Sequence, residues 1–148
     1  MYHKILVPLD GSKRADRILP HVEELARRYQ AKVILLQVVE YRTVPTAEGA
    51  LFSLSDQELD QAKRQAEAHL NGIQGEFRGK KIESKIHVLY GPVVEGILNL
   101  AAREDVDLIA LASHGRGGLA RVFYGSVAAG LLHRVDRPLL IIRSREAE

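Results

Sequence analysis

Five short stretches of apolar residues recur along the chain, and amphipathic segments separate them. Most of these stretches are apolar at nearly every position, which is typical of strands covered on both faces of a sheet. We therefore predict five buried strands. Their ranges are 4–9, 32–39, 85–89 (beginning as early as 82), 108–112 and 139–143.

The segments between the strands place apolar residues every three or four positions, the spacing of one face of an α-helix. Pro20 lies inside the first segment, where it must kink the helix or mark its late start. Pro92 suits the first turn of the helix predicted in the third segment. Serine is a favoured residue at a helix N-cap, so Ser126 suits the start of the helix predicted in the last segment. The helical patterns cover 18–29, 59–77, 94–101 and 127–135.

The alternation of strands and helices predicts a parallel, doubly wound α/β sheet with helices on both faces. Five strands in 148 residues favour the class with a central first strand, in a single domain over 1–148. The one long irregular segment, 41–55, contains Leu51, Phe52 and Leu54. We expect it to be a partly ordered flap beside the binding site, because a purely solvated loop does not need these side chains.

The composition excludes several classes of protein. The formal net charge is +2, the basic residues are mixed with acidic ones, and aromatic residues make up 5% of the chain, so we expect no nucleic-acid partner. No apolar run is long enough for a membrane span. The chain has no cysteine, its histidines lack metal-ligand spacing, and its start turns polar too soon for a signal peptide. We expect a cytoplasmic protein.

Two loops at the carboxyl ends of strands are candidate sites, because ligands of open α/β sheets bind there, where the topology reverses. The first loop is Pro8-Leu9-Asp10-Gly11-Ser12. Asp10 can accept a hydrogen bond from a ribose hydroxyl or hold Mg²⁺. Asp-Gly-Ser is equally strong turn chemistry, in which Ser12 caps the following helix. Both roles can hold at once.

The second loop, 112–126, follows the fourth strand and contains three glycines between positions 115 and 118. Glycine allows the backbone to approach a ligand closely. Gly125 and Ser126 open the last helix, whose free N–H groups and dipole attract phosphate, and Arg116 and Arg121 add positive charge. The alternative is a flexible surface loop followed by an ordinary capped helix.

Two further features of this loop carry less weight. Residues 115–120 match G-x-G-x-x-A, but that dinucleotide fingerprint belongs after the first strand, so we interpret the match as a coincidence. His114 is a candidate general base. Because no nucleophile motif surrounds Ser113 or Ser126, a loop-orienting or exposed histidine is the better interpretation.

The spacing in the second loop resembles the nucleotide signature of the universal stress protein family, in its ATP-binding branch. That signature is Gly-x2-Gly-x9-Gly-Ser/Thr after the fourth strand. Ala112 to Gly115, nine further residues, and Gly125-Ser126 reproduce it, with alanine at the first position. If this position requires a positive φ, the alanine would weaken binding. If it requires only a close approach, the effect would be slight.

The resemblance extends over nearly the whole chain, because residues 5–12 and 137–142 are similar to the first and last strands of the family. It implies a 3-2-1-4-5 strand order and an ATP, ADP or AMP ligand, with Mg²⁺ as a candidate companion ion near Asp10. Asp10 would contact the ribose, and the backbone of Val38 would meet the adenine. The implied nucleotide-binding residues are Pro8, Asp10, Ser12, Val38, Ala112, Gly115, Arg116, Gly125, Ser126 and Val127.

The implied function is a nucleotide-dependent sensor in stress response or signalling, with little or no turnover, because no convincing catalytic base or nucleophile is evident. One alternative is a slow Mg-dependent ATP hydrolase that uses Asp10. Another is a nucleotide-free protein-interaction domain, for which Ala112 is the only support. The sequence does not identify a protein partner. The apolar edge strand 138–143 and the resemblance both predict a homodimer that pairs this strand with its copy.

Overall fold

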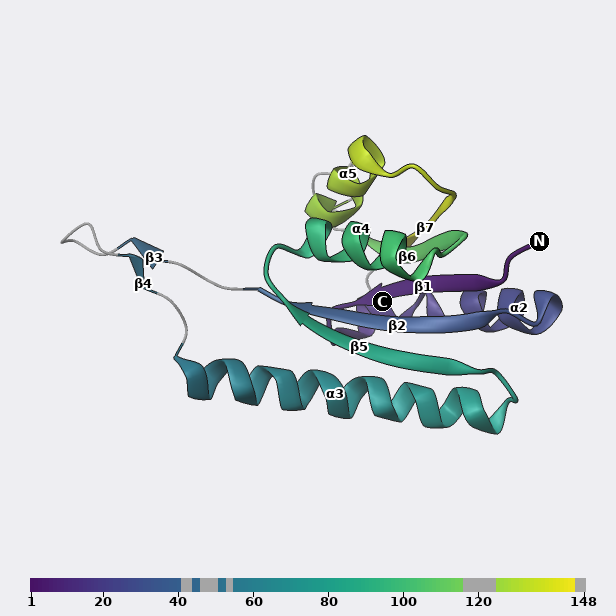
Figure 1. The fold of residues 1–148 in the computed structure, drawn as a ribbon, viewed down its shortest axis with the longest axis horizontal. Helices are drawn as coiled ribbons and strands as arrows, with labels where there is room; N and C mark the ends of the chain where they lie inside the picture. The colour runs from purple at the N-terminus through teal and green to yellow at the C-terminus, as the bar shows by residue number, and fades with distance from the viewer. Residues whose placement is uncertain (41–43, 46–50, 53–54, 116–124, 146–148) are drawn as a thin grey trace.

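A computed structural model describes residues 1–40, 44–45, 51–52, 55–115 and 125–145. Its main sheet has five parallel strands in the order β5-β2-β1-β6-β7, which is the predicted 3-2-1-4-5 order (Figure 1). The strands are β1 (Lys4–Leu9), β2 (Lys32–Val39), β5 (Ser84–Tyr90), β6 (Leu108–Gly115) and β7 (Leu139–Arg145).

Helices cover both faces of the sheet, as predicted (Figure 1). One face packs against α1 (Lys13–Asp16), α2 (Leu19–Tyr29) and α3 (Asp56–Gly79). The other packs against α4 (Val93–Glu104) and α5 (Gly125–Arg134).

The strands contribute to two hydrophobic cores, one on each face of the sheet, which explains why most of the runs are apolar at nearly every position. Successive side chains of a strand point to opposite faces. In β1, Ile5 and Val7 join the core beneath α2 and α3, whereas Leu6 joins the core beneath α4 and α5. All three are fully buried. A polar residue at these positions would lose its water on whichever face it occupied.

The element boundaries agree with the sequence patterns and refine them. The ranges of β1 and β2 are as predicted, whereas β6 and β7 continue three and two residues beyond the predicted ends. Pro20 marks a late start, since α2 begins at Leu19 after the short α1. Pro92 is the residue before α4 rather than part of its first turn. Ser126 lies inside the first turn of α5, so the prediction of a cap there was wrong: the helix already includes Gly125.

Segment 41–55 contains a short hairpin that the sequence did not predict. Its strands are β3 (Val44–Pro45) and β4 (Leu51–Phe52), which form a separate antiparallel sheet. Figure 1 shows the hairpin beyond the start of α3, away from the five-stranded sheet. Leu54 lies outside the described residues, and the flap role stays a prediction.

None of the helices within the described ranges combines the length and the apolar character needed to cross a membrane.

Candidate functional site

The central strand β1 and its neighbour β6 separate toward their carboxyl ends. β1 pairs with β6 at only two register positions, against six with β2. The carbonyl of Lys4 accepts a hydrogen bond from the N–H of Asp107 at 3.0 Å, so even-numbered residues of β1 direct their backbone groups toward β6. Pro8 has this orientation but has no N–H to donate. The strands therefore part just where the topology reverses.

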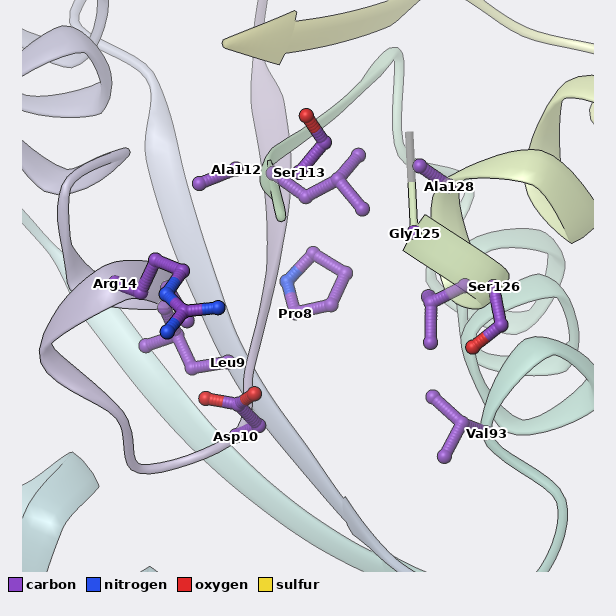
Figure 2. A pocket seen from close by; sticks show the side chains of 13 residues that line it. Pro8, Leu9, Asp10, Arg14, Val93, Ala112, Ser113, Gly125, Ser126 and Ala128 are labelled. Atoms are coloured by element: carbon purple, nitrogen blue, oxygen red, sulfur yellow. The ribbon is translucent and has the colours of Figure 1, made fainter. Parts of the chain in front are cut away.

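A narrow cavity of about 90 Å³ occupies this opening (Figure 2). The ends of β1 and β6 form its floor, with α1 on one side and the start of α5 on the other. Among its described lining residues, the charged side chains are Asp10 and Arg14. Ser113 and Ser126 add hydroxyl groups. Most other lining residues are apolar, so the cavity presents a few polar groups on an apolar background.

A wide groove of about 710 Å³ adjoins the narrow cavity. It runs over the end of β2, with α3 and α4 contributing to its walls. The volume lies within the usual range for small-molecule sites, roughly 300–1,000 Å³. The residues that line both spaces are Pro8, Leu9, Asp10, Val93, Ser126 and Val127. The two spaces therefore form one continuous site with Asp10 at their junction.

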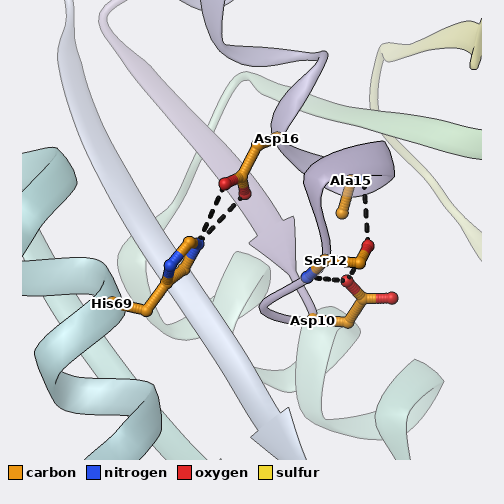
Figure 3. Close-up of polar contacts among 5 residues, drawn as sticks. All are labelled: Asp10, Ser12, Ala15, Asp16 and His69. Carbon is orange, nitrogen blue, oxygen red and sulfur yellow. Dashed lines mark hydrogen bonds and ion pairs between the residues drawn. The ribbon is translucent and has the colours of Figure 1, made fainter. Parts of the chain in front are cut away.

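Asp10 is both a turn residue and a site residue (Figure 3). Its Oδ1 accepts hydrogen bonds from the backbone N–H of Ser12 at 2.9 Å and from the Ser12 hydroxyl at 2.5 Å. The Ser12 hydroxyl oxygen in turn accepts from the N–H of Ala15 at 3.1 Å, which caps α1. The turn and capping predictions are thus confirmed. Asp10 is also exposed and lines both spaces.

The opposite end of α1 is held by a contact from α3 (Figure 3). The Nε2 atom of His69 lies 3.1 Å from both carboxylate oxygens of Asp16. His69 also lines the wide groove. The sequence did not single out this histidine, because its place depends on how α3 docks beside α1.

The backbone of Val38 faces the wide groove. The N–H of Lys32 donates toward β1 and that of Val33 toward β5, so even-numbered residues of β2 direct their backbone groups to the β1 side. The register between β1 and β2 ends at Leu9 and Gln37. The Val38 carbonyl therefore lies beyond the last paired residue, at the groove that Val38 lines.

Gln37 was also not predicted from the sequence as a site residue. A polar residue near the end of an otherwise apolar strand could have indicated it. It lines the wide groove beside Gly11. Its Oε1 is buried and has no hydrogen-bond partner within the described part of the chain. A buried acceptor without a partner loses free energy, so a donor group on a ligand would stabilise it.

Ala112 and Gly125 have different backbone requirements. Ala112 lies in β6, paired with Ile142, and its φ is not positive. Alanine therefore fits this position without backbone strain, which favours the close-approach alternative. Gly125 has a φ of 74°, in the left-handed region that suits glycine, and it opens α5. The start of α5 directs the positive end of its dipole at the narrow cavity.

The structure brings together most of the predicted site residues. The two spaces are lined by Pro8, Asp10, Val38, Ala112, Gly125, Ser126 and Val127. Ser12 lines neither space but contacts Asp10 and caps α1. Gly115 ends β6, whereas Arg116 and Arg121 lie outside the described residues, as does the G-x-G-x-x-A match beyond Gly115. Within the described ranges, no group of three or more acidic or histidine side chains is arranged to hold a metal ion.

Relatives align with the chain over nearly its whole length, and solved structures share its architecture. The universal stress protein MJ0577 of Methanocaldococcus jannaschii is 27% identical to the chain, with 99% of this chain and 98% of the relative aligned. YxiE of Bacillus subtilis is also 27% identical, over 97% of this chain and 100% of its own length. The solved structure of MJ0577 has a TM-score of 0.75 at 25% identity and covers 99% of both chains.

Two more distant structures carry named ligands. A universal stress protein solved in complex with cAMP has a TM-score of 0.64 at 20% identity and covers 97% of this chain. The Archaeoglobus fulgidus protein in complex with dAMP has a TM-score of 0.64 at 22% identity and covers 95% of this chain. At these identities the likeness shows the fold alone.

The family model described as the universal stress protein family matches residues 1–143. This match spans every element from β1 into β7, and the relatives above align over nearly their whole lengths. The chain therefore belongs to the universal stress protein family.

Proposed function

We propose that this protein binds an adenine nucleotide, with the adenosine in the wide groove and the phosphates in the narrow cavity. The observation that carries the proposal is the continuity of the two spaces, which pass from the Val38 carbonyl over Asp10 to the start of α5. Each part of this path has chemistry that suits one part of the ligand.

The wide groove suits the nucleoside. The Val38 carbonyl can accept a hydrogen bond from the adenine amino group, and apolar side chains such as Ile97 and Val93 offer a surface for the base. Asp10, at the junction, can accept hydrogen bonds from ribose hydroxyls. Gln37 offers a further acceptor from the floor of the groove.

The narrow cavity suits the phosphates. The first turn of α5 supplies backbone N–H groups, a positive dipole end and the Ser126 hydroxyl. The predicted roles of Gly115 and Arg116 at the phosphates complete the proposal. A Mg²⁺ ion would take Asp10 as its protein ligand and its other ligands from phosphate oxygens and water, because this is how Mg²⁺ is commonly bound with nucleotides.

The proposed role is a nucleotide-dependent sensor in stress response or signalling, located in the cytoplasm, with little or no turnover. The cAMP and dAMP complexes of proteins with this fold support an adenine nucleotide ligand in general terms. Bound nucleotide would bridge loops on both sides of the sheet opening and so change the surface presented to a partner.

Isothermal titration calorimetry with ATP, ADP, AMP and NAD tests this proposal. We expect adenine mononucleotides to bind with a dissociation constant well below 1 mM, about the value at which binding contributes 4 kcal/mol. Failure of every adenine nucleotide to bind at millimolar concentration would contradict the proposal. In parallel, phosphate release should match a buffer control. Steady phosphate release by the wild type would instead indicate a hydrolase, if this release disappears in Asp10→Ala while the variant still binds the nucleotide.

We also propose a homodimer through β7, which forms one edge of the sheet. The N–H of Ile109 donates to the carbonyl of Pro138 at 3.0 Å, so even-numbered residues of this segment face β6 and odd-numbered ones face outward. Arg143 is exposed and has an outward N–H by this alternation. Pairing with a second copy would cover this edge.

The substitution Arg143→Pro removes this outward N–H and leaves the hydrogen bonds to β6 in place. By symmetry two hydrogen bonds are lost in a dimer, so at roughly 1 kcal/mol per bond we expect the dimer dissociation constant to rise about thirtyfold. Sedimentation velocity over a concentration series measures it. A monomeric wild type, or a variant that dimerises equally well, would rule out this interface.

A further inference from the structure

We propose that Arg14 binds the phosphate chain and selects nucleotides by their number of phosphates. This inference deepens the proposed function, and it rests on the narrow cavity and the charges that line it. Arg14 lies on α1 and lines this cavity but not the wide groove. Figure 2 shows its guanidinium turned toward the cavity, with Ser126 on the opposite wall.

The described lining of the narrow cavity carries one acidic and one basic side chain. Asp10 and Arg14 are the charged residues among the described lining of the narrow cavity. The Asp10 carboxylate, at the junction where it suits a ribose, would by itself repel phosphate oxygens. The Arg14 guanidinium offsets this repulsion, and its planar set of N–H donors matches phosphate oxygens in pairs. Nearby, the α5 start attracts the same phosphates from the other wall.

Arg14 is held in place before a ligand arrives. Its helix has only four residues, Lys13–Asp16, but both ends are fixed. Ser12 caps the start, and Asp10 accepts hydrogen bonds from Ser12. His69 contacts Asp16 at the end. A cation on a fixed backbone loses less conformational entropy on binding than one on a loose loop.

The narrow cavity reaches from α1 and β1 to the end of β6. From Asp10 it continues past Pro8 to Ala112 and Ser113 at the end of β6. In the proposed placement of the nucleotide, Arg14 therefore lies beside the phosphates and not beside the adenosine. Its contribution should therefore be absent for adenosine, small for AMP and largest for ATP.

The test is calorimetry with adenosine, AMP, ATP and sodium tripolyphosphate on the wild type, Arg14→Gln and Arg14→Lys. For Arg14→Gln we expect the ATP dissociation constant to rise about tenfold, typical of one lost hydrogen bond to a charged group. Adenosine affinity should change by less than about twofold. Arg14→Lys should recover part of the ATP affinity, because it keeps the charge but not the paired donors.

Lys13→Gln is the matched control. It removes the same charge from the same helix, but Lys13 is exposed and lines neither space. We expect its ATP affinity to stay within about twofold of the wild type, because an exposed charge that does not line the site is weakened by water and salt. Thermal melting of each variant confirms that it is folded at the temperature of the titration.

The outcomes separate this inference from the proposed function. An equal loss for adenosine and ATP in Arg14→Gln, or no loss for ATP, would overturn the role of Arg14 while leaving nucleotide binding intact. If no adenine compound binds the wild type, the proposed function fails. Tripolyphosphate binding that disappears in Arg14→Gln would then still support Arg14 as a polyphosphate site, and its persistence in that variant would refute it.

Discussion

Asp10→Ala is expected to weaken nucleotide binding about a hundredfold, because Asp10 has two functions at the junction of the site. The substitution removes the carboxylate that faces the ribose. It also removes the acceptor for the N–H and the hydroxyl of Ser12, which fixes the start of α1 and with it Arg14. Adenosine and ATP should both lose affinity in calorimetry, unlike in Arg14→Gln, where only the phosphorylated ligand should.

Asp10→Asn separates the two functions. Its amide oxygen can still accept from the Ser12 N–H, so the turn is kept, while the charge at the junction is lost. We expect a loss of affinity of about tenfold, intermediate between the wild type and Asp10→Ala. If Asp10→Ala bound adenosine as well as the wild type, Asp10 would be a turn residue only.

Phe77→Ala is expected to lower the free energy of unfolding by about 3–5 kcal/mol, the largest effect on stability among these variants. Phe77 is fully buried on α3, in the core shared with β1 and β2. Typical domains have a total stability of only about 5–15 kcal/mol. For a chain of this length the melting temperature should fall by roughly 6–20 °C in calorimetric or circular dichroism scans.

Glu76→Ala is the control for this variant, since Glu76 is exposed in the same turn of α3. Its stability should stay within about 0.5 kcal/mol of the wild type. A decrease in Phe77→Ala no greater than in this control would mean that α3 contributes little to the core. In that case α3 would also be a poor support for His69 and the end of α1.

The fold was predictable because the inner strands β1, β2 and β6 are buried on both faces. Runs such as 32–39 need apolar residues on each side, so the pattern marks the strand with little dependence on its neighbours. The ends of the strands were harder to predict. β6 and β7 continue past their apolar stretches into Ser113 and Ser144, which are buried polar residues that a pattern of apolar positions does not capture.

The site was predictable where the chain itself brings residues together. Asp10 and Ser12 are close in sequence, and the ends of β1 and β6 meet because the topology requires it. Arg14 and His69 depend instead on packing. Arg14 faces the cavity because α1 is a separate short helix, whereas the sequence suggested one pattern with a proline in it. His69 reaches Asp16 from α3, 53 positions away in the chain.

The brief pairing of β1 with β6 has a mechanical consequence. The sheet is joined by two register pairs there, but by six between β1 and β2 and seven between β6 and β7. Strands β1 and β6 therefore share the fewest register pairs of any neighbours in the sheet, with β5, β2 and β1 on one side and β6 and β7 on the other. A ligand that contacts Asp10 on one side of this boundary and α5 on the other would link the two parts of the sheet. Its binding free energy would then stabilise the whole folded domain against unfolding.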